Sequence, residues 1–403
     1  MHLLHGNHLA YCTNVHRGES WTDTLAKLEQ HTLKVRERVA SGEPYAIGLR
    51  LAQRAAAELS QPETLTAFQR WLEKHGCYVF TINGFPYGDF HGARVKENAY
   101  APDWSTPERL AYTQQLFTLI ATLAPADAGG SVSTVPGSFK AWTQREPARR
   151  EAILANLSRC AEHIARLSQK TGKDLHLGIE PEPACTVETT EETLALFADW
   201  REVSPRVESE GWLRYVGVNY DCCHLAVEFE SARTSLQQLT DAGLRISKLH
   251  ISSALKVQPT ADARAALSAF VEPRYLHQVV VAERGAVTRR YVDLPDALAD
   301  TAAVRAGEEW RIHYHLPLHA APGAPFADTR DHVLDALDWL KLHPHACRHF
   351  EMETYTWEVL PAELQLGIEE QLIREYAWTL EALAARGLVG AGQASRLAAG
   401  ILT

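Results

Sequence analysis

Short apolar runs alternate with longer amphipathic stretches along the whole chain. The short runs are rich in β-branched and aromatic residues and end at Gly, Pro or Asn, which is typical of strands. The stretches between them, such as 22–40 and 107–124, carry apolar residues at helical spacing. Ser20-x-x-Asp23 predicts the start of the first of these helices. Strands are predicted at 8–14, 45–51, 78–84, 130–136, 175–181, 215–221, 246–252, 310–316 and 348–354.

This alternation predicts one α/β domain over residues 1–403, folded as a (β/α)8 TIM barrel. Nine candidate strands compete for eight places, and we expect 310–316 to be the additional one. Residues 257–309 form a predicted insertion, in which two β-rich runs flank Gly285 and indicate a hairpin. We expect this hairpin to cover the barrel mouth or an interface of a homo-oligomer. Residues 362–403 are predicted to form a helical C-terminal extension.

The composition is that of a soluble globular enzyme, with 46% hydrophobic and 22% charged residues. The net charge of -10 and the lack of a Lys/Arg run argue against a nucleic-acid partner. No apolar run approaches the roughly 20 residues of a membrane span, so no membrane partner is expected. The N-terminus lacks the pattern of a signal peptide, and seven cysteines form no C-x-x-C pair. These features predict a cytoplasmic protein with free thiols.

Four of the predicted strands end in ionisable residues on the face opposite their aliphatic side chains. Residues two apart share a face of a strand, and barrel active sites lie at the carboxyl ends of the strands. The residues brought together in this way are Glu180, Asp221, His250 and Glu353. Three carboxylates and an imidazole on one axis require a cation among them. We therefore predict one divalent metal ion, Mn²⁺ by preference and Zn²⁺ or Mg²⁺ as alternatives.

Each of these residues also has a structural interpretation. Asp221 is a suitable N-cap for the following helix, and a single histidine such as His250 is commonly a hydrogen-bonded core residue. Glu180 stands in a Glu-Pro-Glu-Pro sequence that could simply end a strand. Glu351 and Glu353 share a face, and Glu353 is the preferred ligand because it lies nearer the carboxyl end.

The adjacent thiols of Cys222 and Cys223 raise the question of a zinc site. Neighbouring residues point in different directions on an extended chain, whereas zinc knuckles place two residues between their thiols. We interpret both as buried structural residues. Asp221-x-x-His224 is then the functional pair, with His224 beside the substrate or hydrogen-bonded to a ligand.

A second histidine group, His313-x-His315-x-x-x-His319, places two rings on one face of a predicted strand. It could supply proton-transfer or substrate-binding groups, a second metal site, or only structural hydrogen bonds, and the sequence leaves these open. Polar residues near the ends of early strands are further candidates for the site: Asn14, His16, Asn83 and His91.

The order of these motifs resembles that of the xylose-isomerase-like TIM barrels, which include sugar epimerases. A strand-ending Glu is followed by D-x-x-H, then K-x-H, then a final strand Glu. The segments HLAYCTNVHRGESW and HFEMETYTW further resemble EboE-type metabolite traffic proteins. The resemblance implies a single metal held by the four strand-end residues, with His224 next to the substrate. It also implies that Lys256 binds substrate, whereas Thr186 stands where ketose 3-epimerases have a second carboxylate.

The expected activity is a metal-dependent isomerase or epimerase acting on a sugar-like or cyclitol hydroxy-carbonyl compound in a biosynthetic pathway. Proton transfer by Glu180 and Glu353, assisted by His224, would pass through a metal-stabilised enediolate. The alternatives are a metal-dependent phosphoester hydrolase of the same fold and a non-catalytic metabolite-binding protein. The residues expected to contact the polyol, sugar or cyclitol are Lys256, His313, His315, Asn83 and Glu351.

Overall fold

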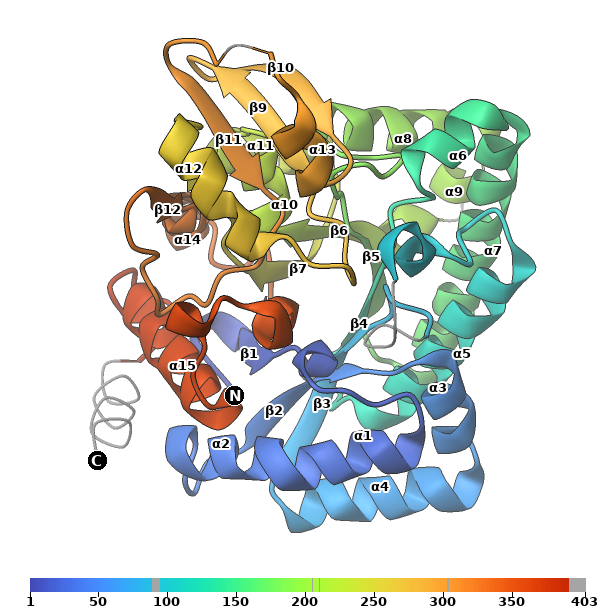
Figure 1. Cartoon of the computed structure of the whole chain (residues 1–403). Helices are drawn as coiled ribbons and strands as arrows, with labels where there is room; N and C mark the ends of the chain where they lie inside the picture. The colour runs from blue at the N-terminus through green and yellow to red at the C-terminus, as the bar shows by residue number, and fades with distance from the viewer. Residues whose placement is uncertain (89–94, 205, 210, 303, 391–403) are drawn as a thin grey trace.

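Eight parallel strands form a ring at the centre of the molecule in the computed structural model, which describes residues 1–88, 95–204, 206–209, 211–302 and 304–390 (Figure 1). Neighbours in the sheet follow the order β1-β13-β7-β6-β5-β4-β3-β2. A parallel bridge between Cys12 and Gly48 joins the first and last strands, so the sheet closes into a barrel. The strands are β1 (His8–Tyr11), β2 (Tyr45–Arg50), β3 (Cys77–Asn83), β4 (Gly130–Thr134), β5 (Leu175–Ile179), β6 (Val216–Asp221), β7 (Ile246–Ile251) and β13 (His349–Met352).

Helices follow each of these strands, as the predicted (β/α)8 architecture requires. The first begins at Ser20, whose Oγ accepts a hydrogen bond from the Asp23 amide, which confirms the predicted cap. The helices around the barrel are α1 (Trp21–Lys27), α2 (Leu33–Val39), α3 (Gln53–Leu59), α4 (Pro62–Lys74), α5 (Pro107–Leu123), α6 (Lys140–Arg145), α7 (Ala148–Thr171), α8 (Thr190–Val203), α9 (Arg206–Ser209), α10 (Cys222–Val227), α11 (Ala232–Asp241), α14 (Arg330–Leu342) and α15 (Ile368–Ala384).

Short 3-10 and π-helical turns connect these elements. One π-helical turn, Leu28–Thr32, joins α1 to α2. The 3-10 turns are Leu4–Gly6, Thr13–Val15, Lys96–Tyr100, Trp212–Tyr215, Leu267–Phe270, Tyr355–Val359 and Ala362–Leu364. Within the described residues, no helix combines the length and the apolar character that crossing a membrane requires.

The two faces of the barrel strands differ in chemistry. Their aliphatic side chains, such as Leu177 and Val218, are fully buried in the main hydrophobic core. The opposite face points into the barrel, where polar groups bond across it: His349 Nδ1 lies 2.8 Å from Ser131 Oγ, and Lys248 Nζ lies 3.0 Å from Ser133 Oγ. The predicted separation of an apolar outer face from a polar inner face is therefore confirmed.

Gly48 permits a close approach inside the barrel. A Cβ atom there would lie 2.0 Å from Glu351 Oε1 and 2.7 Å from the Tyr11 carbonyl oxygen. Any side chain on this strand position would displace Glu351, so the closing strand needs glycine here.

A second, antiparallel sheet interrupts the barrel between β7 and α14. Its order is β10-β9-β11-β8-β12, and it has a hydrophobic core of its own around Trp310. In Figure 1 this sheet stands apart from the barrel strands, near α10 and α11. Its elements are β8 (Leu255–Val257), α12 (Ala261–Ala266), β9 (Val279–Glu283), β10 (Ala286–Tyr291), α13 (Leu294–Ala299), β11 (Glu308–Ile312) and β12 (Phe326–Asp328).

The additional ninth strand is therefore β11, as predicted for 310–316. The hairpin is β9–β10, which turns through Arg284 and Gly285 at φ values of 53° and 84°. The inserted sheet is longer than the predicted range of 257–309, because β8 begins at Leu255 and β12 ends at Asp328. Three-residue strands such as β12 carry too little alternation to be seen in the sequence.

The helix α15 differs from the predicted C-terminal extension. It is the α-helix that follows β13, after two 3-10 turns, and its Tyr376 hydroxyl donates to Tyr45 on β2 over 3.1 Å. Thr379 on the same helix contacts Met352 of β13. We therefore assign α15 as the eighth helix of the barrel. Of the predicted range 362–403, residues 391–403 lie outside the described residues.

Candidate metal centre

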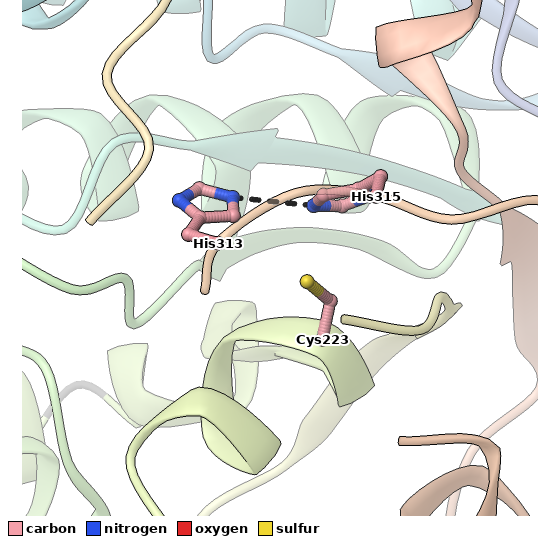
Figure 2. A group of neighbouring side chains, drawn as sticks. All are labelled: Cys223, His313 and His315. Atoms are coloured by element: carbon pink, nitrogen blue, oxygen red, sulfur yellow. Dashed lines mark hydrogen bonds between the residues drawn. The ribbon is translucent and has the colours of Figure 1, made fainter. Parts of the chain in front are cut away.

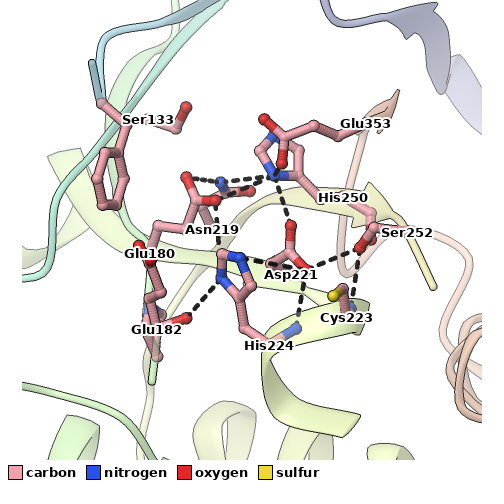
Figure 3. A network of polar contacts seen from close by, with 12 residues as sticks. Ser133, Glu180, Glu182, Asn219, Asp221, Cys223, His224, His250, Ser252 and Glu353 are labelled. Atoms are coloured by element: carbon pink, nitrogen blue, oxygen red, sulfur yellow. Dashed lines mark hydrogen bonds and ion pairs between the residues drawn. The ribbon is translucent and has the colours of Figure 1, made fainter. Parts of the chain in front are cut away.

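The four predicted ligands meet at the carboxyl ends of adjacent barrel strands (Figure 3). Glu180 follows β5, Asp221 ends β6, His250 lies on β7 and Glu353 follows β13. One donor atom from each lies within 4.8 Å of the donors of the other three, and all four side chains are buried. This grouping has the ligand count and spacing of a divalent-metal site.

His250 Nδ1 is the centre of the group. It lies 3.2 Å from Glu180 Oε1, 3.0 Å from Asp221 Oδ2 and 3.1 Å from Glu353 Oε2. Burial alone would lower the His250 pKa, but the surrounding carboxylates outweigh it and hold this pKa well above its usual range. A single N–H cannot satisfy three carboxylates at once. Three hard oxygen donors and one nitrogen donor suit a divalent cation, so the residues fit the predicted ion.

Asp221 combines the two roles that the sequence left as alternatives. Its Oδ1 caps α10 by accepting from the His224 amide at 3.0 Å, and it also accepts from Ser252 Oγ at 2.7 Å. Its Oδ2 faces His250. Burial would raise the Asp221 pKa, but His224 and His250 outweigh it and place this pKa well below its usual range. The helix cap thus fixes the carboxylate for the site.

Glu351 lies on the far side of the His250 ring. Its Oε2 is 2.9 Å from His250 Nε2 and 2.5 Å from Lys248 Nζ, and neither Glu351 nor Lys248 is exposed. Burial would raise the Glu351 pKa, but Lys248 and His250 lower it to about 2. Glu351 therefore orients His250, in the manner of a carboxylate behind a metal-ligating histidine. It does not line the central cavity, so the predicted contact with substrate is not supported.

Amide side chains hold the other two carboxylates in place. Asn14 and Asn83 both donate to Glu353 Oε1, over 2.7 and 2.9 Å. Asn219 donates to Glu180 Oε2 over 2.7 Å. Asn14 and Asn83 were candidates from the sequence, whereas Asn219 was not. Its position two residues before Asp221, on the same strand face, was the signal that could have indicated it.

A cavity of about 50 Å³ opens onto this group. Glu182, not predicted from the sequence, lies in its wall and accepts a hydrogen bond from Tyr100 Oη at 2.8 Å. Burial and the neighbouring carboxylates raise the Glu182 pKa well above its usual range. Its spacing of two from Glu180 was the available signal. The lining residues are Asn14, Asn83, Phe85, Pro86, Lys96, Ala99, Tyr100, Glu180, Glu182, His224, Tyr275, Leu276, His313, Glu353 and Tyr355.

His224 lies in the wall of this cavity, and its predicted place beside the substrate stays a prediction. Its Nδ1 is 3.0 Å from the Pro181 carbonyl oxygen and therefore carries the proton. Burial lowers the pKa of His224 to about 4, and Asp221 only partly offsets this effect. The ring packs edge-on against His313 with 4.5 Å between centroids. His224 is therefore a neutral ring with Nε2 as an acceptor.

Loops next to the strands of the inserted sheet line one side of this cavity. They contribute Tyr275 and Leu276, which precede β9, and His313, which follows β11. On the hairpin of this sheet, Arg290 pairs with the buried Glu228, which follows α10. The insertion thus covers part of the barrel mouth, although the contact residues flank the hairpin. An oligomer interface on the hairpin stays a prediction.

Several predicted site residues lie elsewhere. Lys256 is on β8, between the buried Leu255 and Val257, so it faces outward and contacts Asp331 with both Nζ–O distances at 3.1 Å. Lys256 is not among the residues that line the cavity, so nothing in its surroundings supports the predicted contact with substrate. His319 is half-buried and is not among the cavity-lining residues, and His16 contacts Tyr11 Oη at 2.9 Å. His91 lies outside the described residues.

Comparisons with known proteins give similarities of fold. No protein-family model matches the chain, and no curated protein matches it. Similar solved structures include the probable 3-DHS dehydratase AsbF of Bacillus anthracis, at 15% identity, 91% of this chain, 97% of that chain and a TM-score of 0.48. The IOLI protein with a bound zinc atom matches at 14% identity, over 94% of this chain and 98% of that chain, with a TM-score of 0.48.

A xylose isomerase-like TIM barrel protein from Mycobacterium smegmatis, in complex with magnesium, matches at 13% identity, 88% of this chain, 87% of that chain and a TM-score of 0.47. Xylose isomerase-like barrels are thus among the structures similar to this chain, as the sequence motifs predicted. The finer resemblance to EboE-type proteins stays a prediction. The barrel itself is established by the strand order and pairing of this chain.

Proposed function

We propose that this protein is a divalent-metal-dependent isomerase or epimerase of a sugar-like or cyclitol hydroxy-carbonyl compound. The observation that carries the proposal is the convergence of three carboxylates on His250 Nδ1 at 3.0–3.2 Å, at the wall of a cavity. The residues that would hold the ion are Glu180, Asp221, His250 and Glu353. When bound, the ion would supply Lewis-acid stabilisation of negative charge on substrate oxygens.

In this proposal the two glutamates would serve different faces of a substrate carbon. Glu180 follows β5 and Glu353 follows β13, and in the sheet these strands flank the pair β6–β7 on either side. Epimerisation requires removal of a proton from one face and its return to the other, whereas isomerisation requires one base. Asn219 and the pair Asn14–Asn83 fix these carboxylates, so their oxygens keep their direction during proton transfer.

Neutral polar groups in the cavity suit hydroxyl groups of a polyol. His224 offers Nε2 as an acceptor, because its Nδ1 proton is directed to Pro181. Glu182, held by Tyr100, and Tyr355 add further polar atoms to the same wall. A cavity of about 50 Å³ is smaller than the usual space for a metabolite, so we expect the aromatic wall of Phe85, Tyr100 and Tyr355 to move when substrate binds.

The proposal is tested by deuterium incorporation in D2O, followed by NMR over a panel of aldoses, ketoses and keto-cyclitols with Mn²⁺. Proton transfer at carbon must exchange a substrate hydrogen for deuterium, whereas hydrolysis does not. Glu180→Gln and Glu353→Gln are each expected to reduce exchange by about 10²–10⁴-fold. Glu191→Gln, at an exposed position on α8, is the matched control and should keep full exchange.

One observation supports a second candidate, a metal-dependent phosphoester hydrolase. Cys223, His313 and His315 form another donor group near the first, and such hydrolases commonly use two or more metals. Release of phosphate from a simple phosphomonoester, with no deuterium incorporation into any polyol, would establish this alternative. Metal binding without either reaction would indicate a metabolite-binding protein.

A further inference from the structure

Cys223, His313 and His315 bring a thiol and two imidazoles together outside the four-residue metal centre (Figure 2). Cys223 lies on α10, and the two histidines follow β11 in the loop that connects it to β12. One donor atom from each lies within 4.8 Å of the others, and all three residues are buried. In Figure 2 the sulfur of Cys223 points toward the two rings.

The hydrogen bonds of the two rings determine which nitrogen carries the proton. His313 Nδ1 lies 2.7 Å from Gln278 Oε1. The orientation of this amide is fixed because Gln278 Nε2 donates to the Pro183 carbonyl oxygen over 3.0 Å, and a carbonyl can only accept. His315 Nδ1 lies 2.9 Å from the Glu353 carbonyl oxygen. In both rings Nδ1 is therefore the donor.

It follows that both Nε2 atoms present lone pairs, and these atoms lie 3.2 Å apart. Two buried acceptors facing each other repel, and a cation bound by both would remove this repulsion; the Tyr355 hydroxyl, 3.5 Å from His313 Nε2, is a long contact. A carbonyl or amide oxygen behind Nδ1 is also the arrangement by which proteins orient metal-ligating histidines. Both rings thus have the tautomer and the orientation of metal ligands.

We propose that Cys223 Sγ, His313 Nε2 and His315 Nε2 form a second metal site that binds Zn²⁺. Sulfur and imidazole nitrogen are the preferred ligands of zinc, whereas the carboxylate-rich first site favours harder cations. Cys223 is buried in an apolar cluster with Val227 and Ala254, and zinc coordination would release the proton of its thiol. The interpretation of Cys223 as a purely structural residue is replaced by this role.

Three protein ligands leave a position for water or substrate, as in catalytic zinc sites. His313 is the member of the set that lines the central cavity. His315 also belongs to a donor group with Asp221 and His224, whose ligand atoms lie within 4.8 Å of one another. The second site therefore adjoins the first, and the two would face the same bound molecule. This site does not depend on the proposed isomerase reaction.

The test is the metal content of the full chain, loaded with Zn²⁺ and Mn²⁺ and measured by elemental mass spectrometry. We expect two ions per chain in the unmodified protein, and one in Cys223→Ser and His315→Ala. The neighbouring thiol is the matched control, so Cys222→Ser should keep two. His250→Ala should lose the ion of the first site and keep zinc in the second, which separates the two proposals.

Cobalt substitution provides a readout for the sulfur ligand. The unmodified protein and Cys222→Ser should show a sulfur-to-cobalt charge-transfer band in the near ultraviolet, and Cys223→Ser should lose it while its circular dichroism is unchanged. A protein that binds one ion per chain, a missing charge-transfer band, or equal effects of the two serine variants would overturn the proposal. His313→Gln provides a second variant if Cys223→Ser does not fold.

Discussion

His250 Nε2 lies 2.9 Å from Glu351 Oε2, while the other nitrogen of the same ring faces three carboxylates. The first contact sets the direction of the second, because a ring held at Nε2 can present only Nδ1 to the metal centre. Glu351 is held in turn by Lys248, and all three side chains are fully buried. A buried ion pair, Lys248–Glu351, therefore orients the histidine of the candidate metal centre.

Removal of the Glu351 charge should destabilise the protein strongly. In Glu351→Gln the ammonium of Lys248 becomes a buried charge without its ion-pair partner, which costs about 3–5 kcal/mol in the free energy of unfolding. The double variant Lys248→Met, Glu351→Gln removes both charges and should recover most of this loss. Urea unfolding of the two variants checks the expectation. Equal stabilities for the single and double variants would contradict it.

The two amide hydrogen bonds to the Glu353 carboxylate should determine how tightly the site binds metal. Asn83→Ala removes one of the two N–H donors to Glu353 Oε1, and Asn14→Ala removes the other. Each variant should weaken Mn²⁺ binding by about 10–100-fold, since residues that orient ligands have effects of this size. Chelator competition measures the change. Asn156→Ala is the control. Asn156 lies on α7 and donates a hydrogen bond to the Trp104 carbonyl oxygen, so this variant should leave Mn²⁺ affinity unchanged.

Metal binding should stabilise the folded chain. A ligand at 100 times its Kd, bound only by the native state, adds about 2.7 kcal/mol to the free energy of unfolding. Thermal unfolding with Mn²⁺ should therefore show a higher Tm, and dialysis against a chelator should reverse it. His250→Ala should lose the Mn²⁺-dependent increase, and an increase that survives this substitution would place the ion elsewhere.

The stability of the fold should depend on pH through Glu375 of α15. This carboxyl group accepts hydrogen bonds from Thr354 Oγ1 and the Leu318 amide, and burial raises its pKa from 4.5 to about 7. Because the folded state holds the proton more tightly, its contribution to stability is present below pH 4.5 and is lost as the pH rises toward 7. The loss is about 3 kcal/mol at 1.36 kcal/mol per pKa unit.

Glu375→Gln keeps an acceptor for both donors but cannot ionise. Urea unfolding at several pH values between 4.5 and 7 should show that this variant loses less stability over the range than the unmodified protein. Glu381→Gln on the same helix is the control. An unchanged slope in Glu375→Gln would show that another group governs this range.

Lys256 should be dispensable for activity. Its partner Asp331 is exposed on the outer surface, and the pair contributes at most about 1 kcal/mol. Lys256→Ala should therefore show unchanged substrate exchange and a nearly unchanged Tm. A large rise in KM for this variant would restore the role that the sequence resemblance implied.

The barrel and the grouping of its four strand-end donors could be predicted, because the alternation of side chains along the strands indicates both. Residues two apart on β5, β6, β7 and β13 place one polar side chain at each carboxyl end, and proximity follows from the fold. The position of Lys256 on the inserted sheet could not be predicted, because a count of positions after His250 does not reveal that an antiparallel strand begins at Leu255. Cys223 could not be paired with His313 from the sequence, because they lie 90 positions apart and strands of a separate sheet intervene.

The loop that follows β11 connects the inserted sheet to the central cavity through His313, which lines it, and to the backbone of Glu353 through His315. The insertion has its own hydrophobic core, so it resembles a module that could be gained or removed without harm to the barrel. Its departure would nevertheless remove two histidines and the hydrogen bond from His315 to the backbone of Glu353. A chain without the insertion would thus keep the four strand-end donors but lose one wall of the cavity. The barrel alone would therefore have a different binding site from that of this protein.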